Sequence, residues 1–69
     1  MKAYCNQPKR KGECISVATD ETPSAGETFE ILNKQRQVIN IAQIQRVMGA
    51  RRLIAQARQK FTVEAVIIA

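Results

Sequence analysis

Apolar and polar residues alternate along the first third of the chain, a period typical of β-strands. The alternation covers residues 2–6 and 14–19, and in the second stretch Ile15 and Val17 share one face. A proline and a glycine punctuate the segment between them, so we expect residues 7–12 to form a hairpin loop. The two strands are then expected to pair with each other.

A polar loop and a third alternating stretch follow. Phe29 and Ile31 are expected to point inward from a strand at about 28–32. A short strand near 37–39 is expected to pair with it across a turn at 33–36.

The pattern changes near residue 40 and indicates one long helix at about 41–60. Asn40 is a good N-cap, and Gln43 stands where a capping-box partner belongs. Two cations in the last turn complement the helix dipole. Apolar residues recur at steps of three and four and draw one stripe along the helix: Val47, Ala50, Ile54, Ala57 and Phe61.

Gly49 leaves a second interpretation of this region open. Glycine inside a helix costs about 1 kcal/mol relative to alanine, and Ile41, Ile44 and Met48 lie away from the stripe. A break at Gly49 gives two short helices. That arrangement weakly resembles a helix-turn-helix, whose second helix would face a major groove.

The chain closes with a run of β-branched residues that predicts a final strand at about 62–69. It is expected either as a central strand covered by the helix or as a strand that pairs across a homodimer. The predicted fold is therefore α+β and forms a single domain, residues 1–69. It comprises a mostly antiparallel sheet of three to five strands with the 41–60 helix packed on one face.

Composition places the chain among small folded proteins. With 69 residues, 45% hydrophobic and 25% charged, it suits one thin-cored globular domain. No apolar run approaches the length of a membrane span, and no secretory signal is evident, so we expect no membrane association and a cytoplasmic location. In that compartment Cys5 and Cys14 are expected as free thiols, with a disulfide as the alternative.

Catalytic chemistry has little support in this sequence. Histidine is absent, and two cysteines cannot supply the four ligands of a zinc site. No phosphate-binding glycine motif and no spaced carboxylate pair is present. We therefore expect a protein that is not an enzyme and holds no cofactor or metal.

Charge is separated along the chain, and this is the strongest functional signal. The chain has eleven Lys and Arg residues and six Asp and Glu residues, which gives a formal net charge of +5. Every charged residue in 12–31 is acidic, and every one in 32–63 is basic. A helix that needed only solubility would usually mix signs to form pairs four residues apart.

This separation predicts a small nucleic-acid-binding accessory or regulatory protein, with DNA and RNA both open. Arginine favours bidentate contact with phosphates, and glutamines can contact base edges: Gln43, Gln45, Gln56 and Gln59. The predicted phosphate-binding residues are Arg46, Arg51, Arg52, Arg58 and Lys60 of the expected helix, with Lys34, Arg36, Lys9, Arg10 and Lys11 as outlying contacts.

Two alternatives remain open. The same arginines suit an interaction module or inhibitor that binds an acidic protein or a nucleoprotein complex. The basic half can also pack against the acidic residues of its own chain, in which case no positive face is left.

Overall fold

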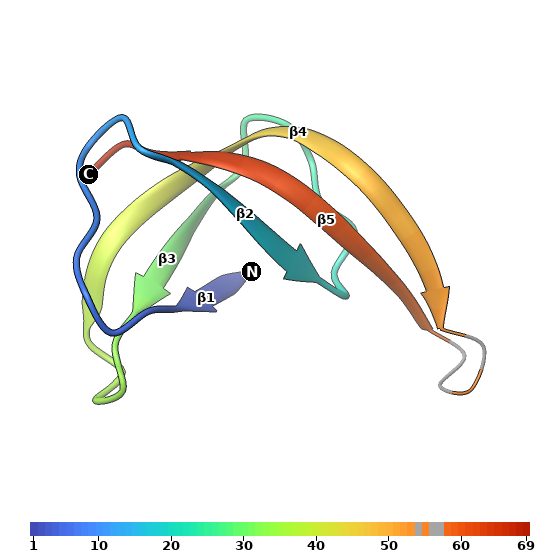
Figure 1. Cartoon of the computed structure of the whole chain (residues 1–69), viewed down its shortest axis with the longest axis horizontal. Coiled ribbons are helices and arrows are strands. Elements are labelled where there is room, and N and C mark those ends of the chain that lie inside the picture. The colour runs from blue at the N-terminus through green and yellow to red at the C-terminus, as the bar shows by residue number, and fades with distance from the viewer. Residues whose placement is uncertain (54, 56–57) are drawn as a thin grey trace.

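Strands replace the expected helix in the computed structural model of this protein (Figure 1). The structure describes residues 1–53, 55 and 58–69. Within that part of the chain there is no α-helix, so the predicted α+β fold, the break into two helices and the helix-turn-helix are all wrong. The elements are β1 (Lys2–Tyr4), β2 (Cys14–Thr19), β3 (Thr28–Leu32), β4 (Val38–Leu53) and β5 (Arg58–Ile67).

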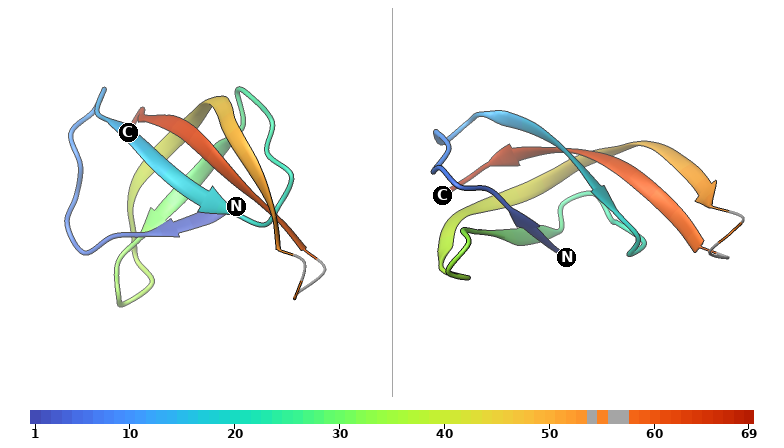
Figure 2. Two further views of the ribbon diagram at one scale, coloured as in Figure 1. Left: turned by 45° about the vertical axis from the view of Figure 1, so that its right-hand side comes forward. Right: turned by 60° about the horizontal axis from the view of Figure 1, so that its bottom comes forward.

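The five strands form one sheet in the order β1-β3-β4-β5-β2. Every neighbouring pair is antiparallel except β1 and β3, which run parallel. The sheet curls into a half-barrel, as the two views of Figure 2 show. The expected hairpin between the first two strands is therefore wrong, because β1 and β2 lie on opposite edges of the sheet.

Several strand predictions are confirmed. The strands expected at 14–19 and 28–32 have those bounds. The short strand expected near 37–39 is the beginning of β4, and it pairs with β3 across the predicted turn at 33–36. The final strand is longer than expected, because it already begins at Arg58.

The core lies on the inner face of the curled sheet. Phe29 and Ile31 point into it from β3, as predicted, and Ile15 and Val17 pack against it from β2. In β4 the inward residues are Ala42 and Ile44, which are 0% and 1% exposed. Among the described residues, the buried apolar cluster consists of Phe29, Ile31, Ala42, Ile44, Val63, Ala65 and Ile67.

The helix prediction fails because β4 gains its burial from distant partners. β3 pairs with its first half and β5 with nearly its whole length. The residues at 38–47 are rich in β-branched side chains, which suit a pleated surface flanked on both sides. The off-stripe position of Ile41 and Ile44 on a helical wheel was a sign of this, since Ile44 belongs to the sheet's inner face.

Asn40, expected as a helix cap, instead ties three segments together inside the sheet. Its Oδ1 accepts a hydrogen bond from the Lys9 amide at 2.8 Å. Its Nδ2 donates to the carbonyl oxygens of Lys9 and Ala69, each at 3.1 Å. The Asn40 side chain is thus a buried polar group whose hydrogen-bonding atoms all have partners.

Replacing Asn40 with alanine is expected to lower the free energy of unfolding by about 1–3 kcal/mol, because three hydrogen bonds of a buried side chain to the backbone of Lys9 and Ala69 are lost. Urea denaturation of Asn40→Ala beside the parent protein measures the change. Gln43→Ala is the control, since its amide makes one exposed bond to the Gly26 carbonyl. Equal stability of both variants would contradict the role given to Asn40.

The C-terminal strand has no free edge along residues 61–66. β5 pairs with β4 on one side and with β2 on the other. The expected homodimer remains a prediction, but strand pairing through β5 has no edge to use between residues 61 and 66. The outermost strands of this sheet are β1 and β2.

Candidate nucleic-acid interface

β4 and β5 continue past the core as a two-stranded ribbon, drawn at the right of Figure 1. We define the ribbon as residues 46–53 of β4 and 58–64 of β5, which pair along this length. β3 pairs with β4 only as far as Gln43, and β2 pairs with β5 only as far as Phe61. The outer part of the ribbon therefore stands clear of the neighbouring strands.

Two register shifts shape the ribbon. The pairing skips Gln45, between Ile44 and Arg46, and again skips Met48, between Val47 and Gly49. An extra residue on one strand is a β-bulge, which bends that strand and increases its twist. The first bulge also brings Arg46 opposite Glu64, whereas an uninterrupted register would place it opposite Val63.

The register assigns the ribbon's side chains to two faces. Directly opposed residues of an antiparallel pair share a face, and successive residues of a strand alternate. Val63 is fully buried on the inner face, which places Lys60 on the outer face together with its partner Arg51. Arg52 and its partner Gln59 then lie on the inner face, beyond the core.

Two cations therefore face each other across the ribbon. Arg51 and Lys60 are directly opposed and exposed. Like charges in this position destabilise a strand pair. Arg52 adds a third exposed cation on the other face.

The acidic residues of segment 12–31 form no ion pair with Arg51 or Arg52 in the described part of the structure. In the described part of the structure, the cations with ion pairs are the Met1 ammonium and Arg46. The Arg46–Glu64 distance is 3.5 Å and the arginine side chain is 67% exposed, so this pair is weak. Arg51 and Arg52 are exposed and make no ion pair with any described residue.

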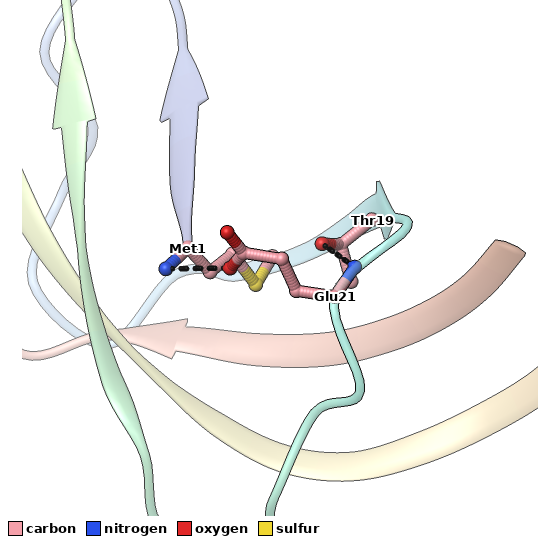
Figure 3. A network of polar contacts seen from close by, with 3 residues as sticks. All are labelled: Met1, Thr19 and Glu21. Atoms are coloured by element: carbon pink, nitrogen blue, oxygen red, sulfur yellow. Dashed lines mark hydrogen bonds and ion pairs between the residues drawn. The ribbon is translucent and has the colours of Figure 1, made fainter.

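Lys60 lies in a more mixed environment. It borders a hollow at the end of β2 together with Asp20 and Glu21. The Glu21 carboxylate is paired with the Met1 ammonium at 2.9 Å, as Figure 3 shows. The backbone amide of Glu21 donates a hydrogen bond to the Thr19 hydroxyl at 3.1 Å. Arg51 and Arg52 are therefore less compensated by nearby carboxylates than Lys60.

The Met1–Glu21 pair also joins the two edges of the half-barrel at one end. Elsewhere the edges stay apart, around an open cleft of about 750 Å³ between β1 and β2. Both cysteines line it and are free thiols, Cys5 half-buried and Cys14 exposed. No described cluster of Cys, Asp and Glu could hold a metal ion.

The other predicted cations do not join the ribbon. Lys9, Arg10 and Lys11 belong to the loop between β1 and β2, and Lys34 and Arg36 to the turn between β3 and β4. Both segments lie at the opposite end of the molecule from the far end of the ribbon, in Figure 1 and in Figure 2. The longest extent of the molecule is 35 Å, so the structure separates these cations into different surfaces.

The remaining predicted contact residues differ in availability. Gln59 and Gln45 are exposed on the ribbon and at its first bulge. Gln43 already donates to the Gly26 carbonyl at 3.2 Å. Gln56 lies outside the described residues, as does the side chain of Arg58, whose backbone pairs with Leu53.

Comparison with known proteins does not identify a family or a function for this chain. No family model, curated protein or solved structure matches this chain. Among the described residues we also find no helix with the length and apolarity needed to cross a bilayer. The case for a function therefore rests on the ribbon's own geometry and charge.

Proposed function

We propose that this protein is a non-catalytic nucleic-acid-binding module whose contact surface is the ribbon. The observation that supports the proposal is the exposure of Arg51 and Arg52, which make no ion pair with any described residue, on a strand pair that extends beyond the core. Guanidinium groups in that setting suit phosphate oxygens, which they contact by two parallel hydrogen bonds.

Phosphate contacts of this kind make binding strongly dependent on salt. The ribbon carries five cations: Arg46, Arg51, Arg52, Arg58 and Lys60. If all five meet phosphates of duplex DNA, the logarithm of affinity falls with the logarithm of salt at a slope of about −4.5. Affinity is then expected to drop by about two to three decades between 50 and 200 mM salt.

Fluorescence anisotropy with labelled random-sequence nucleic acid, at those two salt concentrations, tests the proposal. Salt-sensitive binding supports it. Absence of binding at 50 mM salt to duplex and single-stranded DNA and RNA alike would contradict it. The interaction module that binds an acidic protein is then the remaining function.

One structural feature favours that second function. β2 presents a free edge whose six residues, Cys14–Thr19, carry no charge and no proline. Natural edge strands are usually protected by such residues, and an unprotected edge accepts an extended partner segment by strand addition. Binding of this kind uses the free edge of β2 and neither Arg51 nor Arg52, so Arg51→Gln/Arg52→Gln would leave it unchanged.

Removing the ribbon's own carboxylate is expected to strengthen nucleic-acid binding. Glu64→Gln frees Arg46 from its pair and removes a negative charge from the outer face. We expect affinity at 50 mM salt to rise about three- to tenfold, with a salt slope steeper by up to about one. Glu30→Gln, which makes the same charge change on β3, is the matched control. An equal gain in both variants would show that net charge alone is responsible.

A further inference from the structure

We infer that the ribbon's ligand is double-stranded B-form DNA, and that the ribbon enters the major groove. This inference rests on the proposed function and specifies its substrate class. It follows from the shape of the ribbon, from the placement of its cations on two faces, and from the side chains that the ribbon lacks.

The dimensions of the ribbon match that groove. Two paired strands lie about 4.8 Å apart, and residues 46–53 extend about 25 Å at roughly 3.3 Å per residue. The major groove of B-DNA is about 12 Å wide and admits a two-stranded ribbon. The minor groove, at about 6 Å, would have to be widened, at a cost in DNA deformation energy, to admit a strand pair with its side chains.

The cations lie where a groove has its phosphates. A ribbon lying in a groove has a wall of phosphates on either side, and this ribbon carries Arg51 and Lys60 on one face and Arg52 on the other. A flat phosphate surface would use only one of these faces. Cations on both faces therefore favour an enclosing groove.

The opposition of Arg51 and Lys60 also favours an anion between them. These side chains repel each other across the strand pair. A phosphate that bridges them converts the repulsion into two attractive contacts.

Single strands and RNA duplexes fit this surface less well. Proteins that bind single strands stack bases on aromatic side chains, and the described ribbon has only Phe61, which is half-buried. Tyr4 is 70% exposed, but it lies on β1 and is not part of the ribbon. The major groove of an RNA duplex is too deep and narrow for protein side chains to read.

Competition among matched probes tests the inference. We use a labelled 20-base-pair DNA duplex of random sequence, one of its strands alone, and an RNA duplex of the same sequence, at 100 mM salt. The DNA duplex is expected to bind at least tenfold tighter than either of the other probes. Equal or tighter binding of the single strand or the RNA duplex would overturn the inference and leave the proposed function intact. Absence of binding to all three probes, repeated at 50 mM salt, would defeat both.

A modified duplex tests the groove. DNA whose cytosines carry glucosylated hydroxymethyl groups has the same phosphates but a filled major groove. We expect its affinity to fall at least tenfold, while netropsin, which occupies the minor groove of an A·T-rich duplex, leaves binding unchanged. Unchanged affinity for the modified duplex, or displacement by netropsin, would overturn placement in the major groove.

Discussion

Charge reversal of Arg51 and Arg52 together is expected to weaken duplex DNA binding by at least about a hundredfold. Each arginine supplies a charge-assisted contact worth about 1.5–3 kcal/mol, and glutamates in their place add repulsion. The salt slope is expected to become shallower by about two. Anisotropy titrations of Arg51→Glu/Arg52→Glu and the parent protein measure both quantities. Because both side chains are exposed, the fold should persist.

The chain offers a matched control for this experiment. Lys34→Glu/Arg36→Glu makes the same change in net charge, but in the turn between β3 and β4, away from the ribbon. We expect it to weaken binding no more than about tenfold, through long-range electrostatics alone. Equal losses in the two double variants would mean that affinity follows net charge and that the ribbon has no special role.

Truncation of Ile44 to alanine is expected to lower the free energy of unfolding by about 2–5 kcal/mol. Ile44 is 1% exposed on the inner face of β4, so its removal leaves a cavity in a thin core. A domain of this size has only about 3–10 kcal/mol of stability in total. The midpoint of urea denaturation should therefore fall by about 2 M or more.

This second prediction also distinguishes the sheet from the helix that the sequence indicated. Val38 is in the same strand but 49% exposed, and Val38→Ala should cost less than about 1 kcal/mol. On the wheel of the expected helix, Ile44 lies off the apolar stripe and its truncation would cost little. Similar stabilities for the two variants would contradict the described core.

Local pattern identified the short strands well. The alternation around Ile15 and Val17 and around Phe29 and Ile31 predicted β2 and β3, since each strand presents one face to the core. The turn after β3 was also predictable. There the Asn33 Oδ1 accepts hydrogen bonds from the amides of Gln35 and Gln37, at 3.0 and 2.9 Å.

Pairing between distant segments was not predictable in this way. Neighbouring strands 2–6 and 14–19 were expected to form a hairpin, but each pairs with a strand far along the chain. The pairing of β4 with distant strands was not predictable either. Its apolar residues at steps of three and four fit a helix, and only burial against β3 and β5 determines that it is a strand.

The sequence predicted which residues form the candidate site, but it did not predict how they are arranged. Charge separation named Arg51, Arg52 and Lys60 as contact residues, and a helix would have placed them on two flanks of one stripe. The opposition of Arg51 and Lys60 depends on the register of two strands and on two bulges, which no local pattern reports. Because the ribbon is a pair of strands and not a helix, its dimensions suit the major groove of duplex DNA.

An NMR titration with the DNA duplex would test the central claim most directly. In ¹H–¹⁵N spectra of the labelled protein at 50 mM salt, we predict that the largest shift changes fall on the ribbon amides, with Arg51, Arg52 and Lys60 foremost. The loop at 6–13 and the turn at 33–36 should change little. Changes concentrated instead along β1 and β2, beside the open cleft, would contradict a ribbon-based interface.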